Sequence, residues 1–125
     1  MKKTLLFTAL ILFLSSFQTS PLKQIIEAFK NNKATDVAKY FDNTVEISFD
    51  GNTNTYNRNQ AETVLIQFLL KNPAHNFEII HQSDNGTSAY CIGNLSTSGG
   101  VYRTTVFLKN KNNQVLIQEM RFEHK

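Results

Sequence analysis

The chain has 125 residues, of which 41% are hydrophobic and 18% charged, and its formal net charge is +3 at pH 7. Two of its 13 basic residues are Lys2 and Lys3, so residues 20–125 carry 11 basic and 10 acidic side chains, a net charge of +1. This balance argues against nucleic-acid binding. Cys91 is the single cysteine, which excludes an intramolecular disulfide.

Residues 1–19 have the order of a secretory signal peptide. Lys2 and Lys3 precede an apolar run over 5–14, and small or polar residues follow. The run has about 10 residues where a membrane-spanning helix needs about 20. We therefore expect cleavage, between about Ser16 and Thr19, and a product in the periplasm or medium without a stable membrane anchor. An uncleaved anchor is the alternative.

Residues 20–125 are expected to form one domain that begins with two helices. Ser20 and Pro21 are typical of a helix start, and apolar residues then recur at helical spacing up to Asn31. Residues 34–41 repeat this spacing, which predicts a shorter second helix that ends near Asp42 and Asn43.

A strand and a third helix follow. The alternation over 44–49 predicts a strand that ends at the Asp50-Gly51 turn. Asn57 with Gln60 three residues later is typical of a capping box, and the helix that it starts stops before Pro73.

The remainder of the sequence predicts an antiparallel meander. Strands are expected over 75–82, 87–95, 101–109 and 114–123, separated by Gly- and Asn-containing turns. The fold class is therefore α+β, with three N-terminal helices packed on a curved antiparallel sheet.

Four segments carry a family resemblance: AFKNNKATDVAKYFDNTVEIS from Ala28, TYNRNQAETVLIQFL from Thr55, FEIIHQ from Phe77 and YCIGNLSTSGGVYRTTVFLK from Tyr90. With this order of elements, the chain resembles the nuclear-transport-factor-two-like, or cystatin-like, superfamily. It resembles more closely the exported Bacteroidetes proteins of the domain of unknown function 4783 family. The resemblance implies a cone-shaped fold but no activity, since the superfamily includes both enzymes and binding modules.

Enzymes of that superfamily place an acidic base inside the cone between the helices and the sheet. This base is an Asp or Glu, often paired with a Tyr or His, and no position of this sequence matches such a pair by motif. Tyr40 and Asp42 lie near where some relatives carry pocket residues, but we expect Tyr40 to serve packing and Asp42 helix termination.

Strand alternation sorts side chains into two faces once the register is known. The hairpin at Asn85-Gly86 predicts one shared face for Phe77, Ile79, His81, Tyr90 and Ile92. The hairpin at 110–113 predicts another for Val101, Arg103, Thr105, Phe107, Leu116, Gln118, Met120 and Phe122. A two-residue turn at Gly99-Gly100 merges both sets into the face that the helices cover, and we expect this register. A loop that is longer by an odd number of residues instead puts Tyr102, Thr104, Glu119 and Arg121 on the face that the helices cover.

Polar side chains interrupt the expected covered face, and four of them are the candidate ligand-binding residues: His81, Tyr90, Arg103 and Gln118. A buried polar group must be paired or must face a water-filled cavity. Arg103 therefore either binds an anion inside the cone or pairs with Asp42 or another acid. His81 is expected at the rim of the pocket, without a catalytic role.

No catalytic residue, metal or cofactor is predicted. His75, His81 and His124 are dispersed along the sequence without a metal-ligand spacing. Cys91 lies within an apolar stretch, so we expect a buried structural thiol and not a reactive one.

Three functions remain open. The first is a non-enzymatic exported ligand-binding or protein-assembly module, a homodimer through the uncovered sheet face, which accepts an apolar or anionic small molecule or a protein partner. The alternative is a small pocket enzyme, an isomerase, dehydratase or hydrolase that uses general acid/base chemistry on an apolar small molecule. In the other register Glu119 beside Tyr102 becomes its base. The third is an envelope protein that inhibits or scaffolds another protein.

Overall fold

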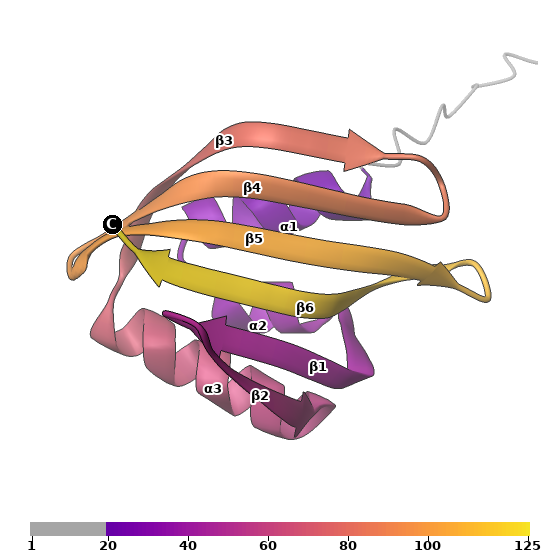
Figure 1. Ribbon diagram of the computed structural model, residues 1–125, viewed down its shortest axis with the longest axis horizontal. Helices are drawn as coiled ribbons and strands as arrows, with labels where there is room; N and C mark the ends of the chain where they lie inside the picture. The colour runs from indigo at the N-terminus through magenta and orange to yellow at the C-terminus, as the bar shows by residue number, and fades with distance from the viewer. Residues whose placement is uncertain (1–19) are drawn as a thin grey trace, which may run out of the picture.

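The computed structural model describes residues 20–125, which form three helices on one side of a six-stranded sheet (Figure 1). The expected signal peptide, residues 1–19, lies outside the described residues. The helices are α1 (Pro21–Lys30), α2 (Ala34–Ala38) and α3 (Arg58–Lys71). The strands are β1 (Phe41–Phe49), β2 (Asn52–Asn57), β3 (Ala74–Asp84), β4 (Ser88–Thr97), β5 (Gly100–Lys111) and β6 (Gln114–His124). Within residues 20–125, no helix is long and apolar enough to cross a membrane.

Local signals explain α1 and α3, and both predictions are confirmed. The Ser20 hydroxyl accepts a hydrogen bond from the Lys23 amide at 3.3 Å, and Pro21 occupies the first turn of α1. In α3 the capping box is complete: Asn57 Oδ1 accepts from the Gln60 amide at 2.9 Å, and Gln60 Oε1 accepts from the Asn57 amide at 3.2 Å.

The second helix is shorter than predicted. It ends at Ala38, and Phe41 and Asp42 already belong to β1. Phe41 pairs with Ile117 of β6, and the Ile117 amide donates to the Tyr40 carbonyl at 2.6 Å. This long-range strand pairing outweighs the helical spacing of the local sequence. Asp42 is therefore the second residue of a strand and does not terminate a helix.

The sheet has the order β2-β1-β6-β5-β4-β3. The predicted meander from β3 to β6 is confirmed, and all its neighbouring strands are antiparallel. β1 adds to the meander by pairing in parallel with β6, and β2 folds back on β1. α1 packs against β3 and β4, whereas α3 packs against β1 and β2, so the helices cover both halves of the curved sheet.

Aromatic rings fill the space between the helices and the sheet. Phe122 is fully buried, and its ring centroid lies 4.6 Å from that of Phe68, 5.3 Å from that of Phe49 and 6.2 Å from that of Phe29. Phe77 adds an edge contact with Phe29 at 5.5 Å. Within the described residues, no buried side-chain nitrogen or oxygen lacks a hydrogen-bond partner. The interior of the cone is a packed apolar core.

Candidate functional site

Two β-bulges decide which side chains face the helices. In β3 the pairing with β4 shifts between Ile79 and His81, and in β6 Gln118 is the extra residue between the pairs Leu108↔Ile117 and Phe107↔Glu119. One extra residue reverses the in-and-out alternation of the strand beyond it. Consequently Ile79 and His81 lie on opposite faces, although they are two residues apart.

The predicted placement of Arg103 inside the cone is wrong. The hairpin between β4 and β5 has a two-residue turn at Ser98-Gly99, which keeps Arg103 on the same face as Tyr90 and Ile92, as predicted. However, the helices cover the other face, whose residues Cys91, Leu95, Thr104, Val106 and Leu108 are buried to 0% exposure. The bulge in β6 adds Met120 and Phe122 to this set, which makes it the more apolar of the two faces.

We call the uncovered surface of β4, β5 and β6 the open face. Its half-buried residues are Tyr90, Ile92, Val101, Thr105 and Phe107, and its charged residues are Arg103, Glu119, Arg121 and Glu123. His81 joins this surface from β3, with its ring centroid 5.4 Å from that of Tyr90. Figure 1 looks onto the open face, with α1 and α2 behind the sheet. The candidates His81, Tyr90 and Arg103 thus share one face, outside the cone, but only His81 and Tyr90 lie side by side.

A cleft of about 380 Å³ adjoins the open face where β1 meets β6. Its lining residues are Asp42, Asn43, Thr44, Glu46, Phe107, Lys111, Gln118 and Glu119. Gln118, the fourth candidate, reaches this cleft because it is the extra residue of the β6 bulge.

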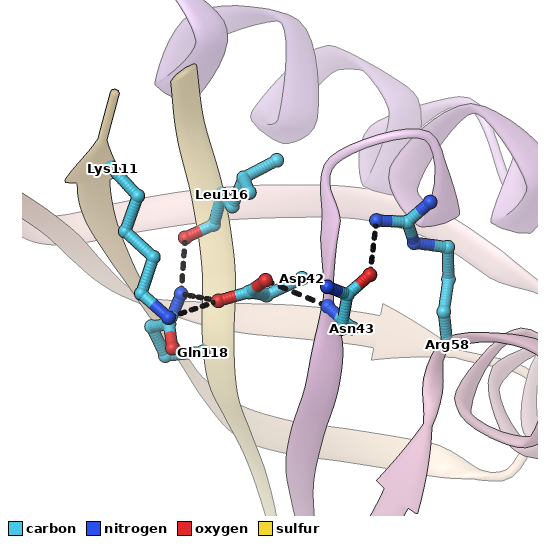
Figure 2. A network of polar contacts seen from close by, with 6 residues as sticks. All are labelled: Asp42, Asn43, Arg58, Lys111, Leu116 and Gln118. Carbon is cyan, nitrogen blue, oxygen red and sulfur yellow. Dashed lines mark hydrogen bonds and ion pairs between the residues drawn. The ribbon is translucent and has the colours of Figure 1, made fainter. Parts of the chain in front are cut away.

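Asp42 is the centre of a polar network in the cleft (Figure 2). Its Oδ2 accepts from Gln118 Nε2 at 2.8 Å and pairs with Lys111 Nζ at 2.8 Å, while its Oδ1 accepts from the Asn43 amide at 2.7 Å. Arg58 Nη2 donates to Asn43 Oδ1 at 3.0 Å, which connects the network to α3. Asp42 is only 7% exposed, and a buried charge is costly unless it is paired. These donors compensate the charge of its carboxylate.

The family model described as Domain of unknown function (DUF4783) matches residues 22–123. The chain belongs to the DUF4783 family. A DUF4783 protein from Bacteroides ovatus, solved by crystallography, is 30% identical and has a TM-score of 0.78 over 82% of this chain and 93% of that chain. No curated protein matches the sequence.

More distant structures show the same fold. An NTF2-like protein of unknown function from Cytophaga hutchinsonii has a TM-score of 0.59 at 7% identity, over 84% of this chain and 89% of that chain. A domain of unknown function with a cystatin-like fold from Nostoc punctiforme has a TM-score of 0.63 at 13% identity, over 84% of this chain and 73% of that chain. The predicted family and the α+β fold class are confirmed, and the chain shares the NTF2-like, cystatin-like fold of these structures.

In this DUF4783 domain the cleft is poorly suited to acid/base chemistry. The hydrogen bonds from Lys111 and Gln118 lower the pKa of Asp42 to about 2, so its carboxylate is ionised and a weak base at neutral pH. Glu119 accepts from Arg121 Nε at 2.5 Å on the open face, whereas Tyr102 faces the helices and packs its ring against Phe68. The alternative pairing of Glu119 with Tyr102 is therefore wrong.

The lowered pKa of Asp42 predicts a pH-dependent stability. An Asp with a folded-state pKa below its usual 3.8 stabilises the fold above pH 3.8, and this contribution is lost as the pH falls toward 2. Allowing for solvent screening, we expect Asp42→Asn to lower the free energy of unfolding by about 1–2 kcal/mol at pH 7. Urea unfolding at pH 7 and pH 2 should show the difference from wild type shrinking in acid.

Asp36→Asn is the matched control, because Asp36 forms an exposed pair with Lys39 at 2.9 Å. Its effect should be smaller than that of Asp42→Asn, since solvent screens both charges. A difference for Asp42→Asn that stays constant between the two pH values would contradict a role for its ionised form.

The histidine and cysteine side chains of the described residues are dispersed. Within 20–125, no group of three or more His, Cys, Asp and Glu side chains could hold a metal ion. His124 Nε2 lies 3.2 Å from the Gly99 carbonyl, far in sequence from His75 and His81. Burial raises the pKa of the Cys91 thiol to about 12, so Cys91 is the buried structural thiol that was predicted.

Sequence reasoning missed Lys111 and Asn43 as members of the network. The sequence does not signal the bulge that builds the cleft, because Leu116, Met120 and Phe122 keep an even spacing. Ile117 and Met120 are both fully buried but three residues apart, which a regular strand cannot achieve. The bulge is therefore seen only in the burial and pairing of the folded strand.

Proposed function

We propose that this DUF4783 domain is a non-enzymatic exported assembly module that pairs with a second copy of itself through the open face. The observation that carries the proposal is an apolar strip that no element of the described chain covers. Tyr90 of β4 lies beside Phe107 of β5, and Ile92 lies beside Thr105 in the next pair on the same face. Export rests on the signal-like order of residues 1–19.

The size of the sheet supports a stable contact. With strands spaced about 4.8 Å apart and a rise of about 3.3 Å per residue, the uncovered side of all six strands has a footprint of about 800 Å², of which the open face on β4, β5 and β6 is about half. A typical specific interface buries about 800 Å² on each partner. The contact would therefore have to extend from the open face onto the neighbouring strands, with the half-buried aromatic and aliphatic residues of the open face at its centre.

The charges on the open face favour a second copy as the partner. A two-fold interface brings the same surface patch of both chains together, so the patch must complement itself. β6 presents Glu119, Arg121 and Glu123 in alternation of sign, and Arg103 lies opposite Glu123 in the β5–β6 register. Both signs are thus available within one patch for pairing across a two-fold axis.

The pocket-enzyme alternative has less support. The core between helices and sheet is packed, and the most buried carboxylate, Asp42, is held ionised by Lys111 and Gln118. A general base works best with a pKa near the operating pH, which is far above that of Asp42.

The variant Ile92→Glu tests the assembly function. A carboxylate at the centre of the apolar strip should weaken self-association by at least about tenfold, the size of a modest interface hot spot. Sedimentation equilibrium from 1 to 200 µM measures the association, and circular dichroism checks that the variant is folded.

Leu70→Glu is the matched control, because Leu70 is 74% exposed on α3 and not part of the open face. It should leave self-association unchanged. A wild-type protein that stays monomeric over this concentration range would refute the proposal, as would an equal loss of association in both variants.

A further inference from the structure

We propose that a groove between α3 and the end of β1 binds an amphiphilic carboxylate, with its aliphatic chain in the groove and its carboxylate on Lys71. The groove has a volume of about 530 Å³ and is lined by Phe49, Val64, Gln67, Phe68, Leu70 and Lys71. This site is separate from the open face and from the cleft at Asp42. None of the four ligand-binding candidates of the sequence contributes to it.

The spacing along α3 builds the groove. Val64, Phe68 and Lys71 recur at intervals of four and three residues, so they lie along one side of the helix. Phe49, at the end of β1, closes the groove opposite them, with its ring centroid 5.0 Å from that of Phe68. The floor is therefore aromatic and aliphatic, and its volume falls within the range of about 300–1,000 Å³ that small-molecule sites show.

Leu70 extends this apolar surface around α3. It is 74% exposed, and beyond it lies a second hollow of about 460 Å³ whose apolar lining residues include Ala34, Ile66 and Leu69. Leu70 lines both hollows. Contiguous exposed apolar surface of this kind marks binding sites more often than a single exposed leucine does. An aliphatic chain is the ligand group that fits such a strip.

Lys71 and Gln67 give the groove its polar edge. The ion pairs in the described part of the chain involve Lys39, Lys111 and Arg121, so Lys71 has no acidic partner there. Its ammonium group can pair with a ligand carboxylate, and the Gln67 amide can add a hydrogen bond. A neutral hydrocarbon would leave this charge unused, whereas a small hydrophilic anion would leave the apolar floor in water.

A titration with octanoate and 1-octanol tests the proposal, because the two share one aliphatic chain and differ in charge. In ¹⁵N-labelled protein, octanoate should shift the amide signals of Val64, Phe68 and Lys71 and bind more tightly than octanol. Lys71→Glu should weaken octanoate binding by about fivefold or more and leave octanol binding unchanged. Lys30→Glu is the matched control, since Lys30 occupies the last turn of α1.

Any of three affinity results would overturn the proposal: no binding of octanoate up to its solubility limit, equal affinities for octanoate and octanol, or an equal effect of Lys30→Glu and Lys71→Glu. Signal shifts confined to the open face would overturn it as well. Leu70→Glu should weaken octanoate binding without changing self-association, and Ile92→Glu should do the reverse. This crossed pair of variants separates failure of the groove proposal from failure of the assembly proposal.

Discussion

Replacing Phe122 with Ala is expected to lower the free energy of unfolding by about 3–5 kcal/mol. Phe122 is fully buried at the centre of the core, with the rings of Phe29, Phe49 and Phe68 around it. These rings extend from α1, β1 and α3, so no single shift of one element can fill the space that the substitution leaves. A loss of this size is a large fraction of the about 5–15 kcal/mol of a typical domain.

Urea unfolding followed by circular dichroism measures this loss, since the chain has no tryptophan. Phe107→Ala is the matched control, because Phe107 lies half-buried on the open face of the neighbouring strand. The control should lose much less stability in the monomer. Similar losses for the two variants would contradict the assignment of Phe122 to the covered core.

Gly93→Ala is expected to destabilise the domain by about 2 kcal/mol, an unusual cost for one methyl group. A Cβ at this position would lie 2.6 Å from the Glu78 carbonyl oxygen and 2.6 Å from Cε1 of Phe77. The ring of Phe77 lies where a side chain would be, and the backbone of β3 cannot retreat without breaking its ladder with β4. The bulge between Ile79 and His81 lies directly opposite this glycine.

Thermal unfolding compares Gly93→Ala with Asn94→Ala, the next residue on the same strand, whose side chain points to the open face. We expect a clear drop in Tm for the first variant and little change for the second. Equal midpoints would mean that Phe77 and β3 can move aside, and that Gly93 is not required for their close approach.

Elements with strong local signals could be predicted from the sequence. Pro21 after Ser20 and the Asn57–Gln60 capping box each act within one helical turn, so α1 and α3 follow from a few neighbouring residues. The turns between antiparallel strands are similarly local, since glycine and asparagine adopt positive φ angles at Gly51, Gly86 and Asn113.

Features that depend on distant partners could not be predicted. The start of β1 at Phe41 is set by pairing with Ile117, and no feature of the sequence near Phe41 indicates that it pairs with this distant residue. The two bulges have the same character, because whether a strand carries an extra residue depends on what packs on both its faces. If side chains are assigned to the two faces of a strand by strict alternation, the assignment is correct up to a bulge. Beyond the bulge it places every side chain on the wrong face.

The candidate site includes one feature that the sequence predicted correctly and others that it did not. Tyr90 and Arg103 share a face because the turn at Ser98-Gly99 keeps the predicted parity, but sequence alone did not identify which face the helices cover. Gln118 was predicted among the buried apolar residues of β6, and the bulge instead turns its amide toward Asp42. Asp42 pairs with Lys111 and not with Arg103 because Lys111 lies at the end of β5 nearest to Asp42, whereas Arg103 lies toward the opposite end of that strand.

The last strand along the sequence, β6, lies in the middle of the sheet between β1 and β5. It supplies Ile117, Met120 and Phe122 to the core, so the layer under the helices stays incomplete until these residues can dock. Chains whose core contacts join segments far apart in sequence fold slowly, because the entropic cost of closing the intervening chain must be overcome before the stabilising contacts form. While β6 is still being synthesised, the preceding segments therefore lack three of the fully buried side chains that complete the core.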